Sequence, residues 1–141
     1  MNESNNKHLI AVGLVFLCIF FSDILAGNQN NKALKSKYPW AVILKDTIDM
    51  GVLRHGSTSR NHITIRNEGW HDLIIAGVRS SCGLMIPNWP TDTIRPNEEA
   101  SINFRFNASR LGSFERKVTI HTNAYQKNIV ITVLGEVVPT D

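Results

Sequence analysis

The chain has 141 residues, of which 43% are hydrophobic and 19% are charged, so it can bury the core of one domain and carry a short additional segment. Its formal net charge is +3, and its basic residues are scattered along the chain. Because phosphate binding needs basic residues gathered on one face, this pattern argues against a nucleic-acid partner.

The N-terminus has the pattern of an export signal. Lys7 precedes an unbroken apolar run over residues 9–21, which is shorter than the roughly 20 residues needed to span a bilayer. Small residues follow at Ala26 and Gly27, as expected near a signal-peptide cleavage site.

The sequence therefore predicts a cleaved signal peptide over residues 1–27. An uncleaved membrane anchor through residues 9–25 and a buried helix are the alternatives. Both the cleaved signal peptide and the uncleaved anchor predict an exported protein, periplasmic or extracellular. It would contact a membrane only through this segment, if the segment is not cleaved. Cleavage removes Cys18 and leaves Cys82 alone, so the mature chain has no intramolecular disulfide.

Residues 28–39 are polar and rich in lysine, which predicts a flexible tether. Residues 40–141 show alternation and turn signals, without sustained helical spacing, and are expected to form one domain. The strands expected there are 40–46, 47–53, 57–67, 72–78, 101–107, 113–122 and 129–138. About seven short strands in about 100 residues predict an all-β fold, an immunoglobulin-like sandwich preceded by an N-terminal signal helix.

The last three expected strands have the clearest core pattern. Every second residue is apolar, which places these side chains on one face of a sheet. The residues predicted to share one core are Phe104, Phe106, Val118, Ile120, Ile131 and Val133. Both faces of strand 129–138 are apolar, so we expect this strand in the centre of a sheet or covered on both sides.

The stretch "RSSCGLMIPNWP", residues 79–90, does not alternate. We expect Cys82 to be a small buried residue that closes one end of the sandwich, because free cysteine packs like a small hydrophobe. A reactive thiolate needs electropositive neighbours, and only Arg79 lies close in sequence. A reactive or intermolecular thiol and a metal ligand are the alternatives.

Large apolar side chains lie in the expected loops around this stretch. Trp70, Met85 and Trp89, together with Cys82, form a candidate interaction loop, because exposed aromatic side chains anchor partners. The simpler alternative is that they close the core locally.

The sequence has no recognisable catalytic or ligand-binding motif. None of its five histidines has the spacing of a metal pair, and no nucleophile elbow, zinc-protease motif or phosphate loop is present. We therefore expect no catalytic residue, no cofactor and no metal, and the chain is not expected to be an enzyme.

An ordered set of segments resembles one known family. The segments are "IDMGVLRHG", "ITIRNEG", "LIIAGVRSSCG", "IRPNEEASINFRF", "GSFERKVTIHTN" and "VITVLGEV". Over about residues 44–138 they resemble a family of small exported bacterial domains of unknown function, common in Bacteroidetes-type bacteria. The family's fold is similar to the Hydin-like, sperm-protein-like and pilus-chaperone-like immunoglobulin sandwiches, so the resemblance implies this fold and export, without a reaction.

The chain departs from that family at three places. Members usually have a Phe-Asp-Phe-Gly-like opening, where this chain has Ile48-Asp49-Met50-Gly51. Members often have a second cysteine two residues after the first, where this chain has Leu84, and a glycine in the later turn, where it has Asn97. The loss of the second cysteine puts in doubt any dithiol chemistry of relatives.

The sequence thus predicts an exported, non-enzymatic protein-binding or scaffolding module of the bacterial cell envelope. Its expected partner is another envelope protein, bound through strand edges or end loops. The alternative is a thiol- or metal-handling accessory protein centred on Cys82.

Overall fold

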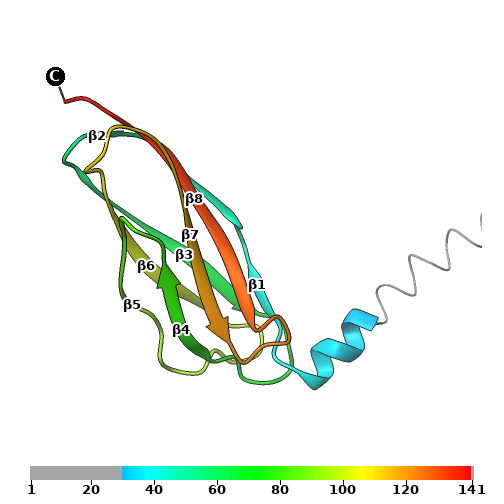
Figure 1. Ribbon diagram of the computed structural model, residues 1–141. Coiled ribbons are helices and arrows are strands. Elements are labelled where there is room, and N and C mark those ends of the chain that lie inside the picture. Colours follow the sequence, from blue (N-terminus) through cyan, green and yellow to red (C-terminus); the bar gives the residue numbers. More distant parts are fainter. Residues whose placement is uncertain (1–29, 141) are drawn as a thin grey trace, which may run out of the picture. The chain divides into compact units, whose positions relative to one another are not determined.

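The computed structural model describes residues 30–140, and Figure 1 shows the arrangement of their strands. Residues from Lys35 onward form one compact unit, which contains every strand. The strands are β1 (Ala41–Ile43), β2 (Thr47–Arg54), β3 (Thr58–Asn67), β4 (Ile75–Ser80), β5 (Leu84–Asn88), β6 (Glu99–Asn107), β7 (Gly112–Thr122) and β8 (Asn128–Val138). The predicted signal peptide and anchor lie outside the described residues.

Residues 30–37 form a short helix, which differs from the tether predicted over residues 28–39. Alanine, leucine and lysine, which are common here, are good helix formers. The end of the helix is also held in place: the Lys35 ammonium lies 2.7 Å from a Glu68 carboxylate oxygen, and the Trp70 amide donates to the Lys35 carbonyl at 3.0 Å. Among residues 30–140, no helix is long and apolar enough to cross a membrane.

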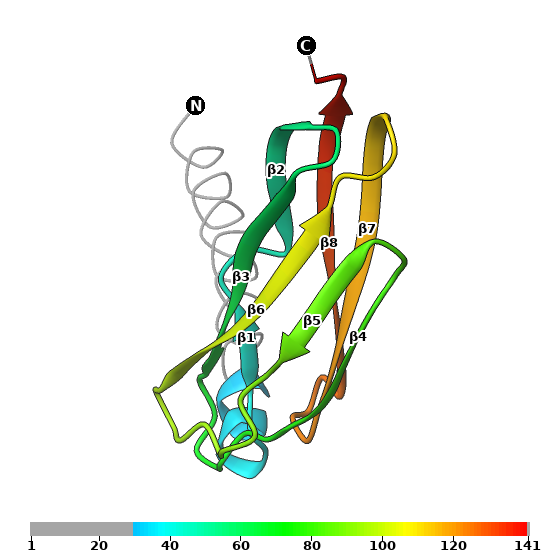
Figure 2. The same ribbon diagram turned by 90° about the vertical axis from the view of Figure 1, so that its left-hand side faces the viewer.

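The strands form two four-stranded sheets that face each other (Figure 2). One sheet has the order β1-β3-β6-β5 and the other has the order β2-β8-β7-β4. Neighbours are antiparallel except β2 and β8, which run parallel. Strands β1 to β5 alternate between the two sheets, and the chain crosses once more between β6 and β7. This arrangement confirms the predicted all-β, immunoglobulin-like sandwich.

The described residues hold one strand more than the pattern indicated. The additional strand, β5, lies within residues 79–90 and pairs with β6, with Leu84 opposite Phe106 and a register shift further along. Pro87 supplies no backbone N–H and is typical of an edge strand, which is where β5 lies. Because the proline and the register shift hide the alternation, this stretch does not have the pattern of a strand.

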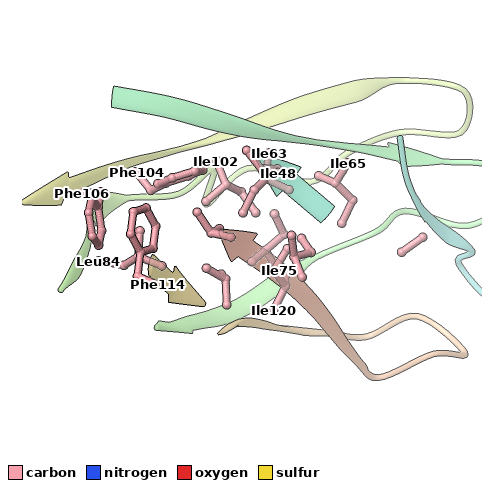
Figure 3. Close-up of a cluster of buried hydrophobic side chains, with 14 of the residues drawn as sticks. Ile48, Ile63, Ile65, Ile75, Leu84, Ile102, Phe104, Phe106, Phe114 and Ile120 are labelled. Atoms are coloured by element: carbon pink, nitrogen blue, oxygen red, sulfur yellow. The ribbon is translucent and has the colours of Figure 1, made fainter. Parts of the chain in front are cut away.

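Side chains from both sheets meet in one core (Figure 3), where Ile63 and Ile102 of one sheet face Ile75 and Ile120 of the other. Six residues were predicted to share the core, and all are at most 4% exposed: Phe104, Phe106, Val118, Ile120, Ile131 and Val133. This confirms the predicted core. Strand β8 is central in its sheet, although Val130 on its outer face is 53% exposed.

Asn67, the last residue of β3, is a fully buried polar residue. Its side-chain oxygen accepts hydrogen bonds from the amides of Gly69 at 2.9 Å and Trp40 at 3.4 Å. Its side-chain nitrogen donates to the carbonyls of His71 at 2.8 Å and Ile94 at 2.9 Å. One side chain thus joins the entry to β1, the β3–β4 loop and the segment before β6. We call this region the Asn67 end of the sandwich.

Candidate functional site at the Cys82 end

The structure separates the four residues of the candidate interaction loop. Cys82 lies in the turn between β4 and β5, Met85 in β5 is 58% exposed, and Trp89 packs against the core just after β5. Trp70 is 67% exposed but lies in the β3–β4 loop at the Asn67 end, away from the β4–β5 turn (Figure 2). Trp70 is therefore not part of a site with Cys82.

Cys82 is exposed, so the prediction that it is buried and structural is wrong. The Ser81 amide donates to the Lys117 carbonyl, and the Lys117 amide donates to the Ser81 hydroxyl, both at 3.0 Å. Gly83 then turns the chain with a φ of +93°, which glycine adopts without strain. After this turn Leu84 is buried, with 6% exposed, so Leu84 has the core-closing role expected of Cys82.

A hollow of about 420 Å³ opens beside Cys82. The β4–β5 turn, the end of β6, the β6–β7 loop and the start of β7 form it. Its lining residues are Cys82, Gly83, Phe106, Asn107, Ser109, Arg110, Leu111, Gly112, Ser113, Phe114 and Arg116. We call it the Cys82 hollow.

The Cys82 hollow has an apolar base and an apolar rim. Phe106 of β6 and Phe114 of β7 stack with ring centroids 4.0 Å apart, which joins the two sheets beneath it. Leu111 in the β6–β7 loop is 59% exposed. Burying such a side chain against a partner removes apolar surface from water and favours association.

Arg116 occupies an unusual position in this hollow. It lies two residues from Phe114 and from Val118, which are both buried, so it has an inward-facing position in β7 opposite Val133. One guanidinium nitrogen, Nη1, donates to the Glu115 carbonyl at 3.0 Å. Its Nε is shielded from solvent and has no hydrogen-bond partner. The sequence analysis missed Arg116, although the alternation of β7 carries the signal: a charged residue at a core-facing position.

The half of the sandwich around Cys82 is basic. Its basic residues are Arg54, Arg60, Arg79, Arg105, Arg110, Arg116 and Lys117. Its acidic residues are Asp46, Asp49, Glu115 and Glu136. Arg60 and Arg105 lie directly opposite each other on β3 and β6, an arrangement in which like charges repel. By contrast, the ion pair found among residues 30–140, between the Lys35 ammonium and the Glu68 carboxylate, lies at the other end of the sandwich. The fold thus gathers arginines that are scattered in sequence.

Two histidines of the described region contact backbone carbonyls. His55 and His71 are exposed and contact the carbonyls of Ser109 and Ser36 at 3.2 and 3.1 Å. Within residues 30–140, no three His, Cys, Asp or Glu side chains lie together in a group that could hold a metal ion.

One family model, described as "Protein of unknown function (DUF1573)", matches residues 42–137. The comparison with curated proteins gives no match. The family match agrees with the resemblance to domains of unknown function seen in the sequence.

Several solved structures are similar to this chain in fold. A protein of unknown function from Porphyromonas gingivalis W83 is 23% identical with a TM-score of 0.62; the match covers 70% of this chain and 46% of that chain. The CARDB domain of the PF1109 protein from Pyrococcus furiosus is 17% identical with a TM-score of 0.56, over 73% and 91% of the two chains. PapD-like domain 7 of human CEP192 is 10% identical with a TM-score of 0.55, over 72% and 87%. At these identities the likenesses show the fold alone, and this chain spans less than half of the Porphyromonas chain.

Proposed function

We propose that this chain, which belongs to the family described as protein of unknown function (DUF1573), is an exported, non-enzymatic module that binds or scaffolds another protein of the bacterial envelope. The likeness to PapD-like and CARDB sandwich domains supports an interaction module. Export to the periplasm or the cell exterior rests on the apolar run over residues 9–21.

The Cys82 hollow is the observation that carries the proposal. It combines a cavity of about 420 Å³ with an exposed apolar side chain at Leu111. Interfaces are centred on apolar anchors that fill pockets on the partner, surrounded by polar groups. An exposed apolar rim above a stacked aromatic base, with two arginines beside it, fits this description.

Cross-linking from each end of the sandwich tests the proposal. The protein carries Cys18→Ser, so that Cys82 is its one thiol, and is labelled with a photoactivatable maleimide in envelope preparations. The control carries Cys18→Ser and Cys82→Ser with Asp72→Cys, which moves the label to the exposed β3–β4 loop at the Asn67 end. We expect a discrete cross-linked protein from Cys82 and none from position 72.

A second variant keeps the test specific to the hollow. Leu111→Asp should abolish the cross-link from Cys82, because it places a charge on the apolar rim without touching the core. Cross-links of equal yield from both ends would contradict the assignment of the site, and their absence from both ends would contradict a protein-binding role.

The exposure of Cys82 favours a second candidate function, a thiol- or metal-handling accessory protein. An exposed single thiol in an oxidising compartment can pair with another chain. If this is the function, the partner stays attached to the chain in non-reducing gels and is released when a reductant is added. Cys82→Ser then abolishes its capture, whereas Leu111→Asp leaves it intact.

A further inference from the structure

We infer that the Cys82 hollow recognises carboxylate groups, and that its ligand is an acidic, partly apolar segment of a partner protein, seated against the guanidinium groups of Arg116 and Arg110. This inference rests on the proposed binding function and adds the chemistry of the partner. It is carried by three features: the hydrogen bonding of Arg116, the charge around the hollow and the apolar surface within it.

Arg116 has more donors than the protein satisfies. A guanidinium group has five N–H donors and no acceptor, and the described chain accepts one hydrogen bond from this group, at the Glu115 carbonyl. The shielded Nε has no partner, and a buried polar group without a partner is costly. A carboxylate accepts two parallel hydrogen bonds from a guanidinium group and would supply the missing acceptors.

Gly83 gives a ligand room to reach Arg116. The Arg116 Nε lies 3.7 Å from the place where a Cβ of Gly83 would stand, so no side chain separates this part of the turn from the guanidinium group. Arg110 lines the same hollow and is exposed. A small outward movement of the Arg116 side chain past Gly83 would present two guanidinium groups to one ligand.

The surrounding charge complements an acidic ligand. Six arginines and Lys117 lie in this half of the sandwich with four acidic residues, Asp46, Asp49, Glu115 and Glu136, and Arg60 directly opposes Arg105. Such a field attracts anions and raises their rate of association, and salt weakens it. An acidic partner would also relieve the repulsion between the arginines.

The apolar part of the hollow favours a peptide over a nucleic acid. Leu111 is exposed, and the stacked rings of Phe106 and Phe114 lie beneath. A peptide can alternate carboxylates with apolar side chains that cover this surface. Nucleic-acid affinity instead comes from many phosphate contacts along one basic face, and only two of the arginines line this hollow.

Binding of paired peptides to the full chain in a neutral detergent tests the inference. The probe is a fluorescent hexapeptide of alternating glutamate and leucine with blocked ends, and its control has glutamine in place of glutamate. At low salt we expect the glutamate peptide to bind at least about tenfold more tightly, as one charge-assisted pair would give. Arg116→Gln should remove about tenfold of this affinity, and Arg116→Lys should restore part of it.

The matched control variant is Arg95→Gln, which removes an exposed arginine before β6 at the Asn67 end and should leave the affinity unchanged. Equal affinity for the two peptides, or an equal loss in both arginine variants, would overturn the inference. Tighter binding of an oligothymidine probe than of the glutamate peptide would overturn it as well. If Cys82 cross-links a partner but the peptides are not distinguished, the proposed function stands and this inference fails.

Discussion

The two ends of the sandwich differ in what surrounds their polar groups. At the Asn67 end, one buried amide makes four hydrogen bonds, Lys35 pairs with Glu68, and Trp40 stacks on Tyr125 with ring centroids 5.7 Å apart. At the Cys82 end, the guanidinium nitrogen Nε of Arg116 has no partner, and the thiol of Cys82 is exposed.

This difference separates structural side chains from available ones. Trp70 is more exposed than Leu111, yet it does not line the Cys82 hollow. The Asn67 end also has shielded side-chain atoms without a partner, Arg66 Nε, His121 Nε2 and Gln126 Oε1, and none of them lines that hollow. Exposure alone therefore does not identify a binding surface. Unsatisfied donors beside a hollow and an apolar rim are a stronger indication, because a ligand there gains hydrogen bonds that the free protein lacks.

The largest expected effect comes from breaking the network of the Asn67 end. Asn67→Ala leaves the Gly69 amide and the His71 carbonyl without their hydrogen-bond partner, and each such loss costs about 1–3 kcal/mol. We expect the free energy of unfolding to fall by about 2–4 kcal/mol, measured by chemical denaturation. Asn107→Ala, at an exposed position of the Cys82 end, is the control and should change it by less than about 0.5 kcal/mol. Similar losses in both variants would remove the contrast between the ends.

Two glycines give a matched comparison of backbone packing. A Cβ on Gly69 would stand 2.6 Å from the Tyr38 carbonyl oxygen, so Gly69→Ala forces two backbone segments apart and should cost about 2–3 kcal/mol. A Cβ on Gly83 meets Phe106 at an ordinary 3.5 Å, so Gly83→Ala should cost about 1–2 kcal/mol, from its positive φ alone. Denaturation curves of both variants measure the difference, and a larger loss at Gly83 would contradict the tighter packing of the Asn67 end.

The core at the centre of the sandwich could be predicted from the sequence, because period-two alternation indicates directly which side chains of a strand face the core. Phe104, Ile120 and Val133 were placed correctly for this reason. The hydrogen-bond network of the Asn67 end could not be predicted, because its hydrogen bonds join residues far apart in sequence, such as Asn67 and Ile94, which are 27 positions apart. A turn-forming asparagine has the same local pattern whether it is exposed or buried.

The Cys82 end was predicted in part. Its stretch was recognised as different, but the exchange of roles between Cys82 and Leu84 depends on the turn at Gly83, and both side chains are apolar enough to be buried. The gathering of arginines depends on strand pairing, such as that of Arg60 with Arg105, which local sequence patterns do not reveal.

Replacing Arg116 should separate binding from stability. Arg116→Met keeps the length of the side chain and removes the unpartnered Nε, so we expect the free energy of unfolding to stay unchanged or rise by up to about 1 kcal/mol. The glutamate peptide should bind this variant weakly. Denaturation and the peptide titration are measured on the same preparation. A loss of more than about 2 kcal/mol would show that Arg116 is instead a structural residue.

The ion pair of the Asn67 end predicts a small dependence on pH. The hydrogen bond from Lys35 lowers the pKa of Glu68. Because this pKa is lower in the folded state, the stabilisation is complete above the pKa of the unfolded chain and is lost as the pH falls through the folded-state value. The pair is partly exposed, so Glu68→Gln should cost only about 0.3–0.5 kcal/mol at neutral pH. Denaturation curves should show this difference vanishing in acid, whereas a difference that persists there would exclude the ion pair as its cause.

The smallest expected effect is that of Cys82→Ser. Because the thiol is exposed, exchanging sulfur for oxygen buries no unsatisfied hydroxyl, and the free energy of unfolding should change by less than about 0.5 kcal/mol. The neighbouring Leu84→Ala is the control: Leu84 is buried, and its truncation should cost about 2–4 kcal/mol. Labelling with a thiol reagent at neutral pH should proceed at about the rate of a free small-molecule thiol, since an exposed cysteine needs no opening of the fold to react. Slow labelling combined with a loss of about 1–2 kcal/mol in Cys82→Ser would place the thiol back in the core. The Cys82 end would then be as closed as the Asn67 end.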